Sequence, residues 1–392
     1  MKLPRKNIAV LAACQALLFA NNSTVIAVNG LAGYALASDK GMATLPVTGW
    51  VIGAALATFP ASLLMKRIGR RAGFYVGASI GMLGAAICAA AVYVASFWLL
   101  CLGTLVFGAY NGIAQYYRFA AADSAAPEFR STAISLVLGG GLVGGLIGPE
   151  ISKFTVDLLQ PEYFGAYLSL MVYLVAVMLV LTLLRIPRPS EAERKESGRP
   201  LREIVKQPEF AVAVLGSALG FGVMNFLMVA TPLAMGFCGH PYSAAALVIQ
   251  WHIVGMFGPS FFTGGLIKRF GVLNVMLSGA LLLYVCVAIA LEGVAVANFW
   301  FALIILGVGW NFLYIGGTTL LLEAYRPAER ATAQGFNDLM IFLTQAVTSI
   351  ASGWLLDHSG WQTLNYLALP FITAVSGALL WLMLRRRAAV AA

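Results

Sequence analysis

The sequence predicts an all-α, polytopic membrane protein with twelve transmembrane helices in two pseudo-symmetric six-helix halves. The chain has 392 residues, of which 60% are hydrophobic and only 10% are charged, a more apolar balance than soluble domains show. The apolar residues form long runs, most of them 18 residues or more, and each is long enough to cross a bilayer as a helix. Sequence landmarks also recur at an offset close to 200 residues.

The runs predict helices because period-2 patterning is absent and an open sheet cannot span lipid. The first run is too long and too polar for a cleavable signal peptide. We place the spans near 8–32, 46–65, 73–95, 97–120, 131–156, 163–185, 209–237, 243–267, 272–292, 297–322, 335–357 and 361–384.

The basic residues predict the orientation of these spans. With the N-terminus in the cytoplasm, 23 of the 25 lysines and arginines, Arg118 among them, fall on the cytoplasmic side, and only Lys40 and Lys153 fall outside. This is the positive-inside bias, so we expect a multi-pass protein of the bacterial inner membrane with both termini cytoplasmic. The net charge of +9 therefore indicates topology and contact with anionic lipid, and no nucleic-acid partner is expected.

The composition changes at one place, between Pro187 and Pro208, where charged residues mix with Pro, Ser and Gly. We interpret 187–208 as a cytoplasmic linker, in part an amphipathic helix, between an N-terminal half (1–186) and a C-terminal half (209–392). The halves share three landmarks: the loops Pro127–Ala133 and Pro327–Ala333, the amides Asn111 and Asn311, and the Lys-Arg-x-Gly sequences ending at Gly69 and Gly271. Matched landmarks at nearly one offset indicate a duplication, with the substrate site expected at the bilayer midplane between the halves.

This pattern resembles the major facilitator superfamily over essentially the whole chain. The loop Met65–Arg71 matches the Gly-and-basic motif of that family, although the usual acidic residue before its first Arg is missing. Topological anchoring explains the same basic residues equally well. The resemblance implies transport by alternating access, with the two halves rocking about a central site.

Two pairs of side chains mark the middle of the seventh and eighth spans. Met224 and Met228 stand four residues apart in the seventh span, and His252 and Met256 do so in the eighth. Residues at i and i+4 share a helix face, and at about 1.5 Å per residue all four lie within roughly two turns of the midplane. Neutral thioethers bind Cu(I) well and hard ions badly, and imidazole also suits copper. These residues are therefore candidate metal ligands, with the alternative that the methionines are packing residues.

Met-x-x-x-Met in the seventh span followed by His-x-x-x-Met in the eighth resembles the CcoA-type copper importers of bacterial inner membranes. The resemblance implies copper import for the assembly of haem–copper oxidases, particularly the cbb3 type, with delivery to a cytoplasmic copper acceptor. Copper is then the transported substrate, no resident cofactor is expected, and the protein is expected to act as a monomer.

Several polar residues leave alternatives open. Asn21, Asn22, Asn111, Gln115 and Asn311 are interpreted either as cavity lining or as hydrogen-bonding contacts between helices. The five cysteines lack the spacing of a disulfide scaffold or a zinc site. Cys238 is interpreted as a copper-receiving residue at the outer mouth of the seventh span or as a small buried residue.

A second functional class is a proton-linked carrier of an organic solute on the same fold, either a drug exporter or a riboflavin-type vitamin carrier. Gly144-x-x-x-Gly148-Pro149 resembles the antiporter motif of exporters, but Glu150 follows where a glycine pair is usual. Glu150 is either an outer-edge residue or a proton-coupling group. Riboflavin carriers related to the copper importers are expected to lack the Met and His set. A membrane-embedded enzyme is disfavoured by the lack of paired acids or a nucleophile motif.

Overall fold

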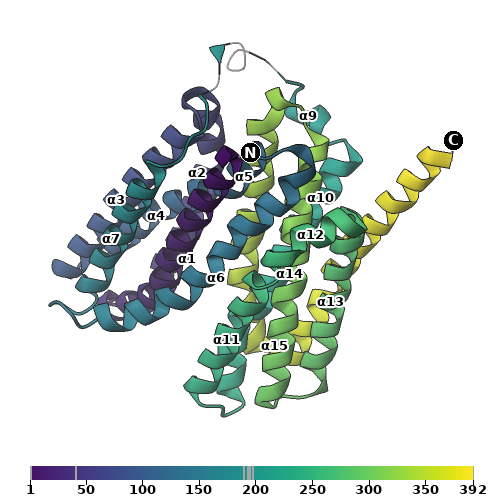
Figure 1. The fold of residues 1–392 in the computed structure, drawn as a ribbon. Helices are drawn as coiled ribbons and strands as arrows, with labels where there is room; N and C mark the ends of the chain where they lie inside the picture. The colour runs from purple at the N-terminus through teal and green to yellow at the C-terminus, as the bar shows by residue number, and fades with distance from the viewer. Residues whose placement is uncertain (1, 40–41, 189, 192–195, 197, 392) are drawn as a thin grey trace. The chain divides into compact units, whose positions relative to one another are not determined.

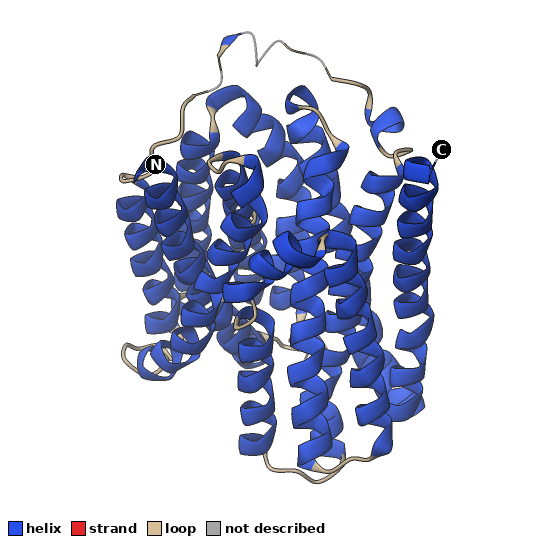
Figure 2. Cartoon of the chain, turned by 45° about the vertical axis from the view of Figure 1, so that its right-hand side comes forward, coloured by secondary structure: helices blue, strands red, loops and turns tan. Residues whose placement is uncertain are grey.

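The computed structural model describes residues 2–39, 42–188, 190–191, 196 and 198–391 (Figure 1). The expectations for Lys40, Arg194 and Lys195 lie outside these residues. The described chain consists of helices joined by short loops, and Figure 2 shows no strand within it. The predicted all-α class is confirmed.

The long helices follow the predicted spans, with a few breaks. Their bounds are α1 Lys2–Leu36, α2 Leu45–Ile68, α3 Arg70–Tyr93, α4 Phe97–Ala114, α5 Tyr117–Asp123, α6 Arg130–Thr155, α7 Phe164–Leu181, α9 Leu201–Ile204, α10 Pro208–Phe237, α11 Tyr242–Phe257, α12 Ser260–Phe270, α13 Val272–Glu292, α14 Val296–Ala324 and α15 Arg330–Ala391.

Eleven helices in the described part of the chain are long and apolar enough to cross a membrane. The last of these segments, Pro327–Ala389, has 63 residues, which is enough for two spans of about 20 residues each. Its regular helix is interrupted at Gly360, which has a φ of 75°. This one segment therefore accounts for the eleventh and twelfth predicted spans.

Glycine explains why the repeated Lys-Arg-x-Gly sequence ends a helix in both halves. Gly69 follows α2 with φ 89°, and Gly271 follows α12 with φ 85°. Side chains disfavour positive φ, whereas glycine adopts it readily. The next helix begins one residue later in each case, so the two glycines set equivalent corners of the duplicated fold.

The chain forms two compact units that exchange short segments. Unit 1 comprises Met1–Ala126, Leu136–Ser197 and Gln334–Phe342, and unit 2 comprises Pro127–Ser135, Gly198–Ala333 and Leu343–Ala392. The first turns of α6 thus belong to unit 2, while the rest of α6 belongs to unit 1. The first turns of α15 similarly belong to unit 1, while the rest of α15 belongs to unit 2.

In unit 1, α4 packs against α2 and α3, and α7 packs against α1 and α3. Close contact between α1 and α6 depends on small residues, as the glycine-rich sequence predicts. A Cβ at Gly144 would overlap the backbone carbonyl of Ala16. Any larger residue at position 144 would push these two helices apart.

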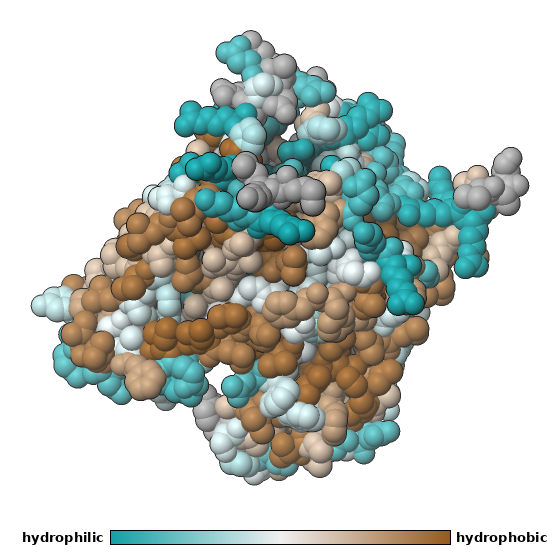
Figure 3. Space-filling view, in the orientation of Figure 1, coloured by the Kyte–Doolittle hydropathy of each residue, from teal (hydrophilic) through white to brown (hydrophobic). Residues whose placement is uncertain are grey.

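In unit 2, α14 packs against α10, α11 and α13. Large apolar side chains such as Phe237, Phe261 and Trp354 remain exposed on the outside of the helices. Figure 3 shows apolar residues covering much of the visible surface, with hydrophilic residues gathered at the top of the view and along its lower edge. Such a surface is suited to lipid rather than water.

Candidate functional site

His252 lies in α11 with no exposed surface. Its Nδ1 is 2.7 Å from the backbone carbonyl oxygen of Leu303 in α14. A carbonyl oxygen only accepts hydrogen bonds, so Nδ1 carries the hydrogen and Nε2 of the neutral ring carries a lone pair. Nε2 is buried and has no hydrogen-bond partner among the described residues. The ring is thus held by one nitrogen and has the other nitrogen free to bind a ligand.

Metal-ligating histidines commonly have this arrangement. The nitrogen that does not bind the metal donates to a backbone carbonyl or a carboxylate, which fixes the tautomer and the ring orientation. An uncharged organic molecule with an N–H or O–H group would also match a free acceptor nitrogen. The geometry of His252 therefore favours a bound ligand without naming it.

The segment from His252 to Met256 runs alongside α14. Asn311 of α14 donates to the backbone oxygen of Met256 at 2.6 Å and to the hydroxyl of Ser260 at 2.6 Å. A Cβ at Gly307 would meet the backbone of His252 and Met256 at less than van der Waals distance. Glycine at 307 and the amide at 311 therefore bring α11 and α14 into backbone contact at the predicted site.

The methionine pair of α10 lies on the face that is turned toward α14. Phe221 packs edge-on against Trp310, with ring centroids 5.5 Å apart. Met224 and Met228 follow Phe221 by three and seven residues, so they share its helix face. Met224 is 2% exposed, Met256 is 7% exposed, and Met228 is partly buried.

The heights of the two pairs also correspond. Gly220 faces Leu313 and Ser217 faces Gly317, so α10 and α14 run in opposite directions. Both helices rise by the same distance per residue, so each step forward along α10 corresponds to one step backward along α14. This register places Met224 beside about position 309 of α14 and Met228 beside about position 305. The pair of α11 lies along positions 303 to 311. The four candidate ligands thus border one stretch of α14, and their joint ligation of one ion stays a prediction.

Other polar residues of the sequence analysis have different surroundings. Asn111 accepts from Asn22 at 3.0 Å and from Gln115 at 3.3 Å, so these amides connect α1 with α4. Glu150 is exposed and pairs with Lys153 at 2.7 Å. An exposed pair of this kind contributes little free energy, which favours the outer-edge interpretation of Glu150. Cys238 is exposed at the end of α10.

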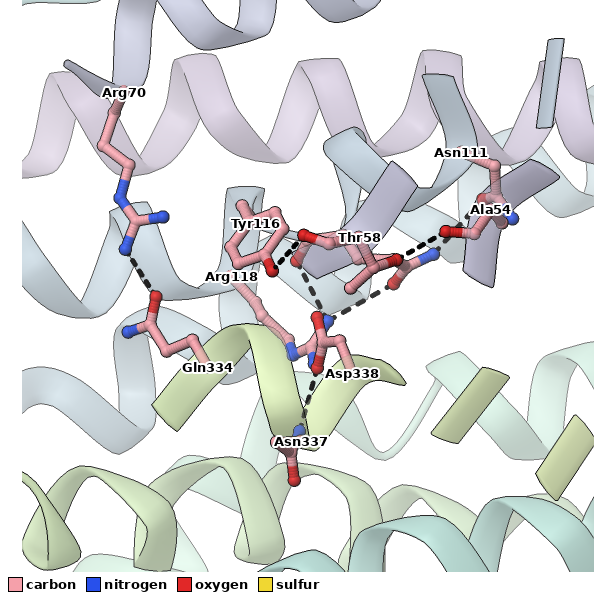
Figure 4. A network of polar contacts seen from close by, with 10 residues as sticks. Ala54, Thr58, Arg70, Asn111, Tyr116, Arg118, Gln334, Asn337 and Asp338 are labelled. Atoms are coloured by element: carbon pink, nitrogen blue, oxygen red, sulfur yellow. Dashed lines mark hydrogen bonds and ion pairs between the residues drawn. The ribbon is translucent and has the colours of Figure 1, made fainter. Parts of the chain in front are cut away.

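Unit 1 contains a charged network that the sequence analysis missed (Figure 4). Arg118, which the sequence analysis counted among the basic residues of the cytoplasmic side, lies buried in α5 and forms an ion pair with Asp338 of α15. Arg118 also donates to Gln115, and Asn337 donates to Asp338 at 2.8 Å. Asp338 interrupts the apolar eleventh span, and this was the available signal, because ionisable residues inside spans are rare and functional.

A second anchored arginine lies in the predicted linker. Arg199 makes two parallel hydrogen bonds to Glu329, at 2.7 and 2.8 Å, within unit 2. The carboxylate raises the pKa of the Arg199 guanidinium by accepting these hydrogen bonds. Bidentate pairs fix geometry better than single contacts do, so the end of the linker is held against the loop that precedes α15.

Comparison with known proteins identifies the family. A model described as Major Facilitator Superfamily matches residues 11–316 and 254–392. The chain belongs to the major facilitator superfamily. The riboflavin transporter RfnT of Brucella anthropi is 42% identical over 374 residues, covering 95% of this chain and 94% of that protein. The uncharacterized MFS-type transporter YddS of Bacillus subtilis is 30% identical over 402 residues, covering 98% and 90%.

Solved structures of transporters share the fold at low identity. FucP in its outward conformation gives a TM-score of 0.77 at 16% identity, covering 95% of this chain and 98% of FucP. A bacterial homologue of the iron transporter ferroportin gives 0.72 at 15% identity, with the same coverage. This chain is thus a multi-pass membrane transporter of the major facilitator superfamily and not an enzyme.

Proposed function

We propose that this major facilitator transporter imports copper across a bacterial inner membrane by alternating access, for the assembly of haem–copper oxidases. The observation that carries the proposal is the combination of thioethers with the buried imidazole of His252, whose Nδ1 is bonded to Leu303 and whose Nε2 has no partner among the described residues. Three thioethers on α10 and α11 border the same stretch of α14. Neutral soft ligands hold Cu(I) without binding it as tightly as thiolates would, which suits a cargo that has to be released.

The orientation and partners are part of this proposal. The positive-inside bias supports cytoplasmic termini, so copper would leave the protein on the side of the linker and reach a cytoplasmic acceptor. Exposed apolar side chains support direct contact with lipid. The chain would act as a monomer.

Riboflavin, or an organic solute of its kind, is the second candidate cargo. It is favoured by the 42% identity to a riboflavin transporter over nearly the whole of both chains. Riboflavin has imide and hydroxyl hydrogens that would match the free acceptor on His252. Whole-chain similarity thus supports the organic cargo, whereas the combination of Met224, Met228, His252 and Met256 supports copper.

Uptake by the purified protein in proteoliposomes separates the two cargoes. We expect accumulation of radioactive copper, supplied as Cu(I), above protein-free vesicles, and no accumulation of radiolabelled riboflavin. In a deletion strain, added copper and not added riboflavin should restore haem–copper oxidase activity. Riboflavin uptake without copper uptake would replace the proposal with the second candidate.

A further inference from the structure

A carboxylate inside a membrane protein needs an explanation, because burying its charge is costly. The side chains of Arg118 and Asp338 are only 1% and 2% exposed. A buried ion pair is weak evidence for stability, since the cost of removing both charges from water often exceeds their attraction. Apolar residues could fill the same space and stabilise the fold at least as well. The presence of this ion pair therefore indicates a role other than stability.

The two oxygens of Asp338 are unequally satisfied. Oδ1 accepts from Arg118 and from Asn337. Oδ2 is buried and has no hydrogen-bond partner in the described part of the chain. An unpaired carboxylate oxygen at low dielectric is a site where a proton can bind.

The charged groups around Asp338 determine whether its carboxylate can bind a proton. The ionisable groups that face Asp338 are Arg118 of α5, Arg70 of α3 and Tyr116 between α4 and α5. Arg70 has its own acid, Asp123, at 3.1 Å. The side of α2 that borders this segment presents Ala54, Ala55 and Ser62, none of which ionises.

Within this set, Arg70 is balanced by Asp123 and Arg118 is balanced by Asp338. Protonation of Asp338 would leave the buried charge of Arg118 without an anion, which is strongly unfavourable. The arrangement seen here therefore requires ionised Asp338. A proton would bind Asp338 only in a conformation in which the first turns of α15 have moved away from α5. Because the proton binds that conformation better, proton binding would in turn stabilise it.

We propose that Asp338 is the proton-binding carboxylate that couples transport to the proton gradient. The proton would come from water, bind at Oδ2 when the pair with Arg118 is open, and return to water on the other side before the pair forms again. No bond other than O–H is made or broken. The proposal does not depend on whether the cargo is copper or an organic solute.

Infrared difference spectroscopy of the full-length protein tests proton binding without any cargo. We expect a carboxylic acid carbonyl band that grows in the wild type as the pH falls and that is absent in Asp338→Asn. Asp357→Asn is the matched control, because Asp357 lies on the same helix with a side chain that is 72% exposed. An unchanged band in Asp338→Asn would overturn the proposal.

Proteoliposomes test coupling, with radioactive Cu(I) and radiolabelled riboflavin as separate probes. Asp338→Asn should lose at least tenfold of the accumulation driven by an imposed pH gradient, while exchange at equal pH is retained. The double variant Arg118→Met with Asp338→Leu removes both charges, so it should fold even if the single variant does not, and it should show the same loss. Full gradient-driven accumulation in either variant would exclude Asp338 as the coupling group. If the wild type transports neither probe, the proposed cargoes fail, and the infrared result alone decides on Asp338.

Discussion

The beginnings of α6 and α15 occupy matching places in the duplicated chain, but they are held by different chemistry. In unit 2, Ser131 and Ser135 of α6 donate to the backbone oxygens of Gly264 and Ser260 of α12. In unit 1, α15 uses Asp338, which pairs with Arg118. At an offset of 200, Asp338 corresponds to Leu138, so the charge has no counterpart in the other repeat.

The candidate copper ligands occur in unit 2, whereas the buried ion pair occurs in unit 1. Met224, Met228, His252 and Met256 all belong to unit 2. The corresponding first helix, α1, contains no methionine or histidine. Asn111 and Asn311, by contrast, are amides in both units and connect helices in both. Our two proposals place cargo binding in unit 2 and ion coupling in unit 1, on a frame whose amide contacts both units share.

The largest expected effect tests the task of unit 2. His252→Ala removes the only imidazole of the predicted spans, so copper uptake should fall to background, at least a hundredfold, while the protein still inserts at normal levels. Uptake of radioactive copper per folded molecule is the measurement. His240→Ala, at a partly exposed loop histidine outside the predicted spans, is the control. Wild-type uptake by a well-expressed His252→Ala variant would exclude the imidazole from the mechanism.

The next largest effect compares how much the contacts at the beginnings of α6 and α15 contribute to the free energy of unfolding. Arg118→Met leaves the buried carboxylate of Asp338 without a cation and should cost about 3–5 kcal/mol of stability. Ser131→Ala removes one neutral hydrogen bond, to the backbone oxygen of Gly264, and should cost about 1 kcal/mol. Thermal unfolding of the two variants in detergent gives the comparison. Equal shifts of the unfolding temperature would mean that the ion pair carries no more free energy than the hydroxyl.

The smallest expected effects separate ligands from packing residues. Met→Leu keeps volume and apolarity and normally costs less than about 1.5 kcal/mol in stability, but leucine has no lone pair for copper. Each of Met224→Leu, Met228→Leu and Met256→Leu should therefore lower copper uptake about tenfold.

The matched controls are Met235→Leu and Met276→Leu, since both methionines are buried away from the candidate site. Uptake has to be normalised to the amount of folded protein in each variant. If all five variants transport copper alike, the soft-ligand site is wrong and only the fold and the family remain.

The sequence alone was enough for the fold and the family, because hydropathy and charge act locally along the chain. Twenty apolar residues cross a bilayer wherever they lie, and the repeated landmarks need no contacts to be recognised. His252 and Met256 were also recognised from local sequence, because residues at i and i+4 share a helix face. Local sequence did not reveal that Arg118 is buried, because a single arginine at the edge of a span is indistinguishable from a topological anchor.

The tertiary structure decided the partners. Asp338 lies 220 residues from Arg118 in sequence, and nothing in the order of residues reveals that the first turns of α15 join unit 1 rather than unit 2. The carbonyl of Leu303 that fixes the ring of His252 is 51 residues away and belongs to the backbone, so no residue type identifies it. Hydrogen bonds and ion pairs between distant segments depend on how the helices pack. The physical reason is that a polar atom needs a protein partner for its hydrogen bonds once burial has removed it from water.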